Sequence, residues 1–401
     1  MNKSKYVFAQ LTAFLDRNHF NYLVRKYDGD KYVKHFTCWN QLLTLMFGQL
    51  SNRESLRDLI IAIEAHYQKC YHLGLGKHVT RSNLAKANTN RDYRIFEEYA
   101  YYLVSEARHK RATDIFKLDG NVYAFDSTTI TLFSNLIFKG VGRHPKTGKK
   151  KGGIKVHANI HANEGVPSDI RFTSAATNDS FMLRPSNYTC GGIIALDRAY
   201  IDYAKFEELT GRYVVYVTKM KKNLVYETES DTMYMNPEGL MEYRVQHVIF
   251  RKHVKDGDDI VHHARIITYA DIRKGKARLV SLLTNDMEME AEDIVEIYRK
   301  RWEIELLFKQ LKQNFPLRYF YGESANAIKI QIWVTLIANL LLMVMQKRIR
   351  RTWSFSNLAT MFRIMLMYYV NSYTCFEEPE KDWAKILKDW ELQPPEPTLF
   401  D

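Results

Sequence analysis

The chain has 401 residues, enough for a sizeable hydrophobic core and for two to four structural units. Hydrophobic residues make up 46% and charged residues 26% of the sequence, a composition that argues against an intrinsically disordered protein. The 58 Lys and Arg against 46 Asp and Glu give a net charge of +12, which favours a polyanionic partner, nucleic acid before membrane.

The first part of the chain, residues 1–115, is expected to be mostly helical. Apolar residues recur at helical spacing over 37–50, and Ser51 with Glu54 forms a candidate capping box ahead of a second helix. A helix-turn-helix and a plain helix pair both fit this pattern, and we prefer the helix pair. The polar, basic segment 79–94 is interpreted as a solvated loop that precedes another helix.

From about residue 116 the pattern changes to strands. Short apolar or alternating runs are separated by Gly-rich and Pro-containing turns, and one helix is expected at 203–210. This order predicts an α/β fold with a mixed sheet. The range 220–285 contains further runs of strand type and no helical pattern, so we expect it to be rich in β structure.

An amphipathic helix is predicted over 297–317, and its apolar arc is interrupted by polar residues. At 100° per residue, Tyr298, Arg301, Glu305 and Lys312 fall within an arc of about 60°. Apolar residues flank this stripe, with Trp302 along one edge. A carboxylate, two cations and a phenol inside an apolar arc indicate a functional surface or a set of ion pairs.

The most apolar window, Ile332–Met345, is shorter than the roughly 20 residues that a membrane span needs, and Thr335 and Asn339 interrupt it. We therefore expect a buried core helix and no membrane partner. The four cysteines are scattered without C-x-x-C spacing, which indicates a reducing, cytoplasmic compartment and no structural zinc.

Three acids stand in apolar surroundings. Asp126 lies in a strand, Asp197 ends the apolar run 191–196, and Glu305 lies on the apolar arc of the helix. Asp126 could bond backbone amides, Asp197 could cap the following helix, and Glu305 could pair with Arg301. Taken together, three acids from two strands and one helix are what a site for two hard divalent cations requires.

The basic stretch 142–155 lies between the first two strands. Its cations are candidates for a phosphate-backbone clamp, with a solvated loop as the open alternative. The candidates are Lys149, Lys150, Lys151 and Lys155. His157 and His161 follow at a spacing that places them poorly for one metal site, so we do not expect them to be ligands.

At these residues the sequence resembles the DDE transposases of bacterial insertion sequences, specifically the hairpin-forming group called insertion-sequence family four. The signature of that group is Y-x2-R-x3-E-x6-K, and Tyr298, Arg301, Glu305 and Lys312 have this spacing. The blocks FDSTTI around Asp126 and LDRAYIDYAKF around Asp197 resemble the first and second Asp blocks of the family, in the same order.

The resemblance implies a ribonuclease H-like core and a particular domain layout. It comprises a helical N-terminal DNA-binding domain over 1–115, a core in two parts over 116–219 and 286–350, a β-rich insertion over 220–285, and a helical C-terminal region and tail over 351–401. The signature helix lies in the second part of the core.

The resemblance also implies an activity. Asp126, Asp197 and Glu305 would be catalytic and would hold two Mg²⁺ ions, for which Mn²⁺ could substitute. Tyr298, Arg301 and Lys312 would contact phosphates, and Trp302 is a candidate to stack on a flipped base.

The expected partner is double-stranded DNA, both transposon ends and target, bound by a homodimer assembled on the DNA. The implied reaction is cleavage at terminal inverted repeats and transfer of 3′ ends by a cut-and-paste hairpin route. A ribonuclease H-fold nuclease without strand transfer and an inactive DNA-binding regulator of transposition remain the alternatives.

Overall fold

The computed structural model describes residues 6–76, 79–109, 122–131, 142–143, 150–151, 153–161, 166–174, 179–254, 258–273 and 276–379. The chain forms two compact units. The helical unit comprises 1–112 and 308–401, and the sheet unit comprises 113–307. The range 286–350, expected to be one part of the core, is therefore divided between the two units after Leu307. The proposed domain layout stays a prediction.

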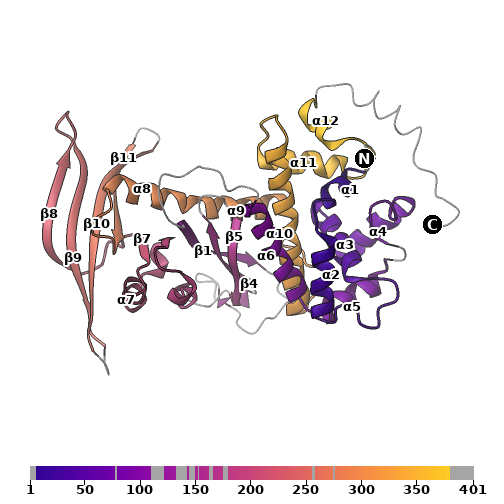
Figure 1. Ribbon diagram of the computed structural model, residues 1–401, viewed down its shortest axis with the longest axis horizontal. Helices are drawn as coiled ribbons and strands as arrows, with labels where there is room; N and C mark the ends of the chain where they lie inside the picture. The colour runs from indigo at the N-terminus through magenta and orange to yellow at the C-terminus, as the bar shows by residue number, and fades with distance from the viewer. Residues whose placement is uncertain are drawn as a thin grey trace. The chain divides into compact units, whose positions relative to one another are not determined.

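The described helices of the helical unit come from both ends of the chain (Figure 1). They are α1 (Val7–Thr12), α2 (Arg17–Lys26), α3 (Cys38–Leu50), α4 (Leu56–Glu64), α5 (Arg81–Asn90), α6 (Arg94–His109), α10 (Ala325–Arg348), α11 (Phe355–Met365) and α12 (Ser372–Glu377), with the short 3₁₀ turn η1 (Tyr67–Lys69).

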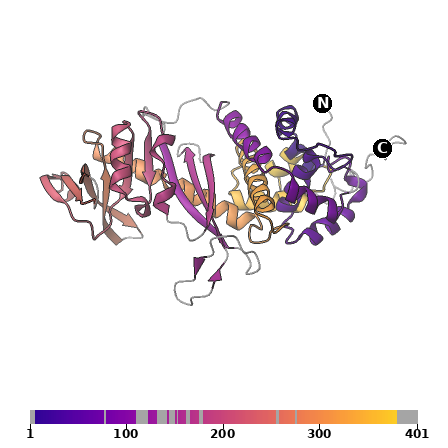
Figure 2. The ribbon, with the colours of Figure 1, turned by 90° about the horizontal axis from the view of Figure 1, so that it is seen from below.

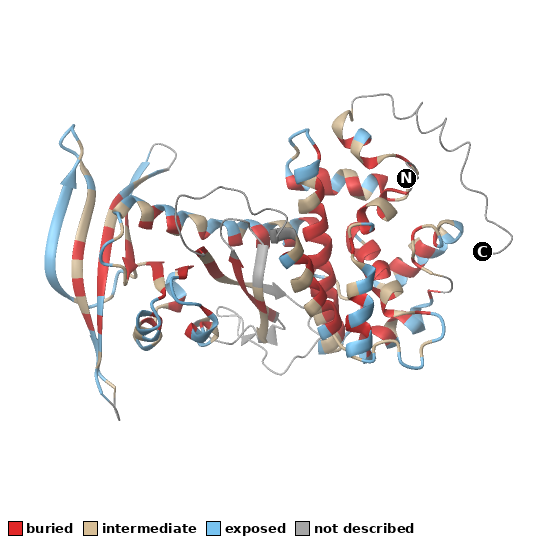
Figure 3. Cartoon of the chain, viewed as in Figure 1, coloured by how far each residue is buried: buried red, intermediate tan, exposed pale blue. Residues whose placement is uncertain are grey.

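The core of the helical unit is built around α10, which packs against α3, α5, α6 and α11. Figure 3 shows buried residues along almost the whole helix. By length and composition α10 could cross a membrane, but 83% of its most apolar window is buried inside the protein. A helix that is apolar on all sides is expected at the centre of a large helical core. The prediction of a buried core helix is confirmed.

Two local predictions for this unit are wrong. The cap of α4 is Ser55, whose hydroxyl accepts a hydrogen bond from the backbone N–H of Asp58 at 3.0 Å. Ser51 instead closes α3, because its hydroxyl donates to the carbonyl of Phe47 and Asn52 then adopts a left-handed φ of 58°. The basic segment 79–94 is not a solvated loop, since it contains α5.

The sheet unit is built on one nine-stranded mixed sheet in the order β5-β4-β1-β6-β7-β11-β10-β9-β8, seen from below in Figure 2. β1 pairs antiparallel with β4 and parallel with β6, and β6 pairs parallel with β7. The first strands in chain order are β1 (Val122–Thr131), β4 (Gly153–His161), β5 (Val166–Ser174), β6 (Ile193–Leu196) and β7 (Val215–Lys219). The mixed α/β architecture is therefore as expected.

The remaining strands of this sheet lie within 220–285. They are β8 (Glu227–Met235), β9 (Met241–Lys252), β10 (Ile260–Arg273) and β11 (Lys276–Thr284). They continue the same sheet, because β11 pairs antiparallel with β7. The helices α7 (Tyr203–Gly211) and α8 (Ala291–Lys300) pack against these strands and their neighbours.

The helix expected over 297–317 is interrupted and shorter. α8 ends at Lys300, and α9 runs over Trp302–Asn314. At Arg301 the hydrogen bonds span three residues, from its N–H to the carbonyl of Tyr298 and from the N–H of Ile304 to its carbonyl. This is a tighter 3₁₀-like turn. α9 ends before Pro316, which has no backbone N–H to continue a helix.

Candidate active site

Two of the three candidate acids lie side by side, at the point where the parallel pairing between β1 and β6 ends. The register of β1 and β6 pairs Phe125 with Leu196. The next residue on each strand is an acid, Asp126 in β1 and Asp197 directly after β6. In open α/β sheets, ligand sites form where the carboxyl ends of parallel strands meet. The sheet therefore places both acids where such sites occur.

Arg301 joins the first acid to the third. Its Nη1 donates to Oδ2 of Asp126 at 3.1 Å, and its Nη2 donates to Oε1 of Glu305 at 2.6 Å. The side chains of Arg301, Asp126 and Glu305 are 10%, 19% and 35% exposed. Hydrogen bonds between charged partners are strong in such partly shielded places. The guanidinium is thus a cation held between two carboxylates that are 179 residues apart in the sequence.

The electrostatics of Asp126 show that the acids are close enough to affect one another. Its pKa is raised to about 6, first because the carboxyl is buried. The hydrogen bond from the Ser127 N–H and the charge of Arg301 oppose this rise, whereas the charges of Asp197 and Glu305 add to it. Like charges gathered in a shielded place favour a bound cation.

Each acid also makes the local contact that would suit a structural role. Oδ1 of Asp126 accepts from its neighbouring N–H, that of Ser127, at 2.7 Å. Oδ1 of Asp197 accepts from the N–H of Ala199 at 2.9 Å and caps the short turn η4 (Arg198–Tyr200). A carboxylate has two oxygens and about four acceptor positions, so these contacts leave room for a second role.

The donor set suits a hard divalent cation, because Mg²⁺ and Mn²⁺ prefer carboxylate oxygens. Among the described residues, however, no group of three or more His, Cys, Asp or Glu side chains is spaced to hold a metal ion. The positively charged guanidinium of Arg301 lies between Asp126 and Glu305, in the position that a metal ion would need to bind both carboxylates. The chemistry of the site therefore fits a metal, provided that Arg301 releases at least one carboxylate.

A cleft of about 750 Å³ lies beside this cluster and includes Asp197 and Arg301 in its wall. Its cations outnumber its acids, and the aromatic residues Tyr269, Tyr298 and Trp302 also line it. The cations are Arg198, Lys219, Arg278, Arg299 and Arg301. Basic side chains interleaved with aromatic rings are typical of nucleic-acid-binding grooves.

The signature residues lie differently in relation to this cleft. Burial raises the pKa of the half-buried Tyr298, and its ring centroid lies 5.5 Å from Cζ of Arg301. Trp302 is 49% exposed. Lys312 is exposed in the last turn of α9 and belongs to the helical unit, so its part in the site stays a prediction.

The basic stretch is only partly described. Lys149 lies outside the described residues, and Lys150 and Lys151 form the short strand β3 (Lys150–Lys151), which pairs with β2 (Gly142–Arg143). Their side chains are not described. Nζ of Lys155 forms an ion pair with Oδ1 of Asp179 at 3.2 Å, and its side chain is 13% exposed. This buried pairing weakens the interpretation of Lys155 as a phosphate contact.

Sequence reasoning missed a polar network behind Asp126. Oδ1 of Asp179 accepts from the Ser127 hydroxyl at 2.8 Å and lies 3.8 Å from Nδ1 of His157. His157 is buried, and its Nε2 bonds the Thr173 hydroxyl at 2.7 Å. Asp179 begins the 3₁₀ turn η2 (Asp179–Met182) and belongs to no strand, so neither a periodic pattern nor the strand pairing predicts these contacts.

Comparison with known proteins identifies relatives of the chain. It is 28% identical over 274 residues to a protein of Synechocystis sp. that is named as a transposase for insertion sequence element IS4SA, an alignment that covers 67% of this chain and 72% of the relative. It is 26% identical over 199 residues to a protein of Sinorhizobium fredii named as transposase y4zB, with 50% and 55% covered. A Geobacillus stearothermophilus protein, named as a transposase for insertion sequence element IS5377, is 22% identical over 218 residues, with 54% of each covered.

Two family descriptions match the chain. Residues 3–76 match a domain of unknown function, and residues 117–341 match the transposase DDE domain. These matches and relatives confirm the prediction of a DDE-type transposase of bacterial insertion sequences. The assignment to insertion-sequence family four and the role of its signature stay predictions. Because the second match covers more than half of the 401 residues, the chain belongs to the transposase DDE domain family.

Proposed function

We propose that this DNA transposase binds the terminal inverted repeats of its element, cleaves DNA with two divalent metal ions and transfers 3′ ends to target DNA. The proposal includes the cut-and-paste hairpin route of insertion-sequence family four. The observation that carries it is the bridge of Arg301 between Asp126 and Glu305, beside an Asp197 that the sheet register aligns with Asp126. The proposal places these three acids, one in β1, one directly after β6 and one in α9, in a single metal site.

In this proposal Asp126, Asp197 and Glu305 hold two Mg²⁺ ions, or Mn²⁺ in their place. The bound ions would activate a water or a 3′-hydroxyl and stabilise the leaving oxygen. Arg301 neutralises the carboxylates of Asp126 and Glu305 in the metal-free protein, and it would be free to contact a phosphate if ions replaced it there. The raised pKa of Asp126 means that its carboxyl is ionised only above about pH 6 in the absence of a second cation.

The basic cleft is the proposed path of the DNA beside the acids. Lys219, Arg278 and Arg299 offer positive charge along its wall. Such contacts fix the position of a phosphate backbone without reading its sequence. Trp302, with 49% of its surface exposed, can stack on an unpaired base. Two copies of the chain would assemble on the DNA as a homodimer, with Lys312 as a further phosphate contact.

An inactive DNA-binding regulator is the second candidate. One observation favours it, because every one of the three acids already has a structural partner in the protein. In that case the polar stripe on α8 and α9 would be a set of ion pairs and nothing more. A nuclease that cleaves without strand transfer differs from the first proposal only in its products.

The test is a cleavage and strand-transfer assay on a duplex that carries the element's own terminus, with Mg²⁺ and with Mn²⁺. Glu305→Gln should lower cleavage by several orders of magnitude, because the amide cannot replace a charged metal ligand, while a gel shift on the same DNA stays unchanged. The matched control is Glu292→Gln, an exposed acid in the first turn of α8 that does not line the cleft. It should cut like the parent. Equal cleavage by the two variants would favour the regulator, and cleavage without joined products would favour the nuclease.

A further inference from the structure

A cavity of about 560 Å³ lies in the helical unit, and both ends of the chain contribute to its wall. We call it the α11 cavity. One part of the wall comes from residues between 6 and 69, and the other is the segment 363–369 at the end of α11 and beyond it. The first part falls in the match to a domain of unknown function, and the second lies outside both family matches. The comparisons therefore assign this cavity no role.

The α11 cavity is basic. Its wall contains four basic side chains, Arg53, His66, Lys69 and Arg363, and no Asp or Glu is among the described residues that line it. Arg53 already pairs with Asp58 at 3.3 Å and donates to the carbonyl of Ser51 at 2.8 Å. The positive charge that is left for a ligand therefore comes from Lys69 and Arg363, with His66 beside them.

Arg363 is half-buried and is only partly satisfied by the protein. Its Nη2 donates to the carbonyl of Asn314 at 2.9 Å, whereas its Nε is buried and has no hydrogen-bond partner in the described part of the chain. Burial lowers the pKa of Arg363, and among the described residues no carboxylate offsets this effect. A shielded cation with an unused N–H costs free energy, which an anion bound to that N–H would recover.

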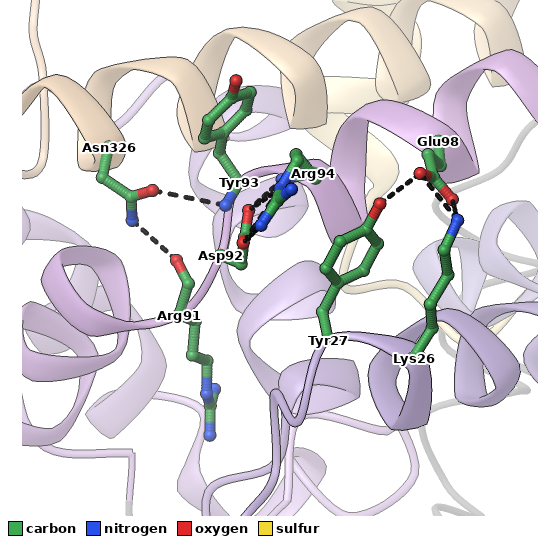
Figure 4. Close-up of polar contacts among 8 residues, drawn as sticks. All are labelled: Lys26, Tyr27, Arg91, Asp92, Tyr93, Arg94, Glu98 and Asn326. Atoms are coloured by element: carbon green, nitrogen blue, oxygen red, sulfur yellow. Dashed lines mark hydrogen bonds and ion pairs between the residues drawn. The ribbon is translucent and has the colours of Figure 1, made fainter.

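Several other cations of the helical unit have acidic partners, which sets the α11 cavity apart. Figure 4 shows two such ion pairs, Lys26 with Glu98 at 2.7 Å and Arg94 with Asp92 at 2.5 Å. The buried Arg91 pairs at 3.5 Å with an acid, Asp30, in the loop 27–36 between α2 and α3. Where this unit shields a cation for structural reasons, it thus supplies a carboxylate. At Arg363 it supplies a carbonyl alone.

Lys69 and His66 bring positive charge from the opposite part of the wall. Lys69 ends the 3₁₀ turn η1, and His66 directly precedes that turn. Nζ of Lys69 lies 3.5 Å from the carbonyl oxygen of Met367, so this lysine reaches the segment that follows Arg363. Burial, and then the charge of Lys69, lower the pKa of His66. An anion held between these side chains would oppose the second effect, because opposite charges favour the protonated ring.

The rest of the wall suits a flat organic group. Tyr6 and Tyr369 line the cavity as an edge-to-face pair with ring centroids 5.1 Å apart, and Phe47 and Tyr368 add two more rings. Aromatic faces and edges make favourable contacts with another planar ring. The volume also falls in the range of roughly 300–1,000 Å³ that is usual for small-molecule sites, which combine an apolar lining with a few polar groups.

A small molecule fits these features better than a polymer does. His66, Lys69 and Arg363 are all half-buried, and the free Nε of Arg363 is fully shielded. A duplex contacts cations that project from a protein surface, because its own phosphates lie along the outside of a rigid cylinder. A free phosphate group can instead enter a cavity and be bound from several sides.

We propose that the α11 cavity binds a small organic phosphate that carries a flat aromatic ring, the chemistry of a free nucleotide. Arg363 and Lys69 bind the phosphate, His66 donates a hydrogen bond to it, and the tyrosine rings contact the flat group. None of these residues belongs to the candidate active site. The inference goes beyond the proposed reaction on DNA and does not depend on it.

The experiment titrates the full chain, without DNA, with each of four nucleoside monophosphates in a calorimeter. Adenosine and inorganic phosphate serve as probes for the two halves of the ligand. At least one nucleotide should bind with a Kd below about 1 mM, and more tightly than either half, because the rings and the cations act together. Failure of all four nucleotides to bind, or equal binding of inorganic phosphate alone, would overturn the proposal.

Two variants locate the site. Arg363→Gln and Lys69→Gln should each weaken nucleotide binding about tenfold or more, because each removes a charged hydrogen bond to the phosphate. The matched control is Arg57→Gln, an exposed arginine of α4 that does not line the cavity, and it should bind like the parent. Arg363→Gln also loses the contact with Asn314, so Lys69→Gln decides the outcome if the first variant does not fold. Parent-like affinity in Lys69→Gln would contradict the site.

A competition experiment separates a small ligand from DNA. A mixed-sequence duplex added to the nucleotide complex should leave the nucleotide bound. Release of the nucleotide, with equally weakened duplex binding in Arg363→Gln and Lys69→Gln, would make the cavity a DNA contact and would overturn the proposal. Glu305→Gln should bind the nucleotide like the parent. A wrongly assigned metal site would therefore leave this result unchanged, and the two proposals fail separately.

Discussion

Two buried arginines, Arg301 in the sheet unit and Arg91 in the helical unit, have similar burial but different partners. The exposed fraction of each is 8%. Arg91 donates mainly to neutral groups, two backbone carbonyls and the side-chain oxygen of Gln41, and pairs with one acid, Asp30. Arg301 donates to two carboxylates, with a third nearby.

The partners indicate what each arginine does. A guanidinium that donates to backbone carbonyl groups holds a loop in place, a role that a divalent cation does not fill in this loop. A guanidinium that neutralises several carboxylates provides charge, which a metal ion can also provide. We therefore interpret Arg91 as a structural residue and Arg301 as a cation that metal ions can displace.

The largest expected effect separates the two arginines by stability. Arg91→Ala should lower the free energy of unfolding by about 3–5 kcal/mol, because it leaves a carboxylate and several carbonyl groups without their buried partner. Added Mg²⁺ should not restore the loss. Urea unfolding with and without Mg²⁺ measures both. A loss below about 1 kcal/mol would show that the loop does not depend on this residue.

The next largest effect is a change in the free energy of unfolding with pH. It tests the carboxyl group of Asp126, one of the charged partners of Arg301. The pKa of Asp126 is about 6 in the folded protein and 3.8 as its ordinary value, so the folded state binds more protons between these two pH values. Stability from this group is thus lost as pH rises from about 4 to about 6, by up to about 3 kcal/mol. Unfolding at pH 4.5 and pH 7 without divalent ions should show that Asp126→Asn reduces this loss. An identical pH dependence in parent and variant would contradict the placement of Asp126.

A smaller effect is expected for Arg301→Ala. The carboxylates that it leaves are partly exposed and can be hydrated, so the loss should be about 1–2 kcal/mol. Unlike the loss in Arg91→Ala, it should be recovered when Mg²⁺ is added, because an ion that binds only the folded state stabilises it. The control Arg299→Ala, exposed and two residues before Arg301, should change neither value. If Mg²⁺ fails to recover Arg301→Ala, the bridge is a structural ion pair like that of Arg91.

The smallest effect concerns charge outside both arginine sites. Replacing Lys149, Lys150 and Lys151 with Ala should flatten the salt slope of DNA binding by up to about three units if the run contacts phosphates. Lys155→Ala should lower stability and leave the slope unchanged, because Lys155 is paired with Asp179. An unchanged slope for the triple variant would show that the three lysines do not contact phosphates, and it would favour the interpretation of the basic stretch as a solvated loop.

The sequence was sufficient for features that depend on local patterns. The strands, the core helix α10 and the polar stripe around Arg301 all follow from periodicity. The pairing of Arg301 with Asp126 of β1 does not follow from periodicity, because the two residues are 175 positions apart and no local rule predicts the contact. The same applies to Tyr269 and Arg278, which reach the cleft from β10 and β11 through the sheet order alone.

Other differences arise where two local rules compete. Ser51 and Glu54 fit a capping box, yet the left-handed turn at Asn52 moves the start of α4 to Ser55. The regular stripe from Tyr298 to Lys312 predicted one helix, but the backbone tightens at Arg301, whose side chain is held by two carboxylates. The first difference follows from a local turn, and the second accompanies the long-range contact between Arg301 and Asp126.

The most direct test of the central claim is a count of bound metal ions. Mn²⁺ binding to the parent, to Glu292→Gln and to an Asp126→Asn, Glu305→Gln double variant can be followed by electron paramagnetic resonance, with duplex DNA present. The account predicts that the parent and Glu292→Gln bind the same number of ions, and that the double variant loses them. Binding of the same number with the same affinity by all three proteins would contradict a metal site at Asp126, Asp197 and Glu305.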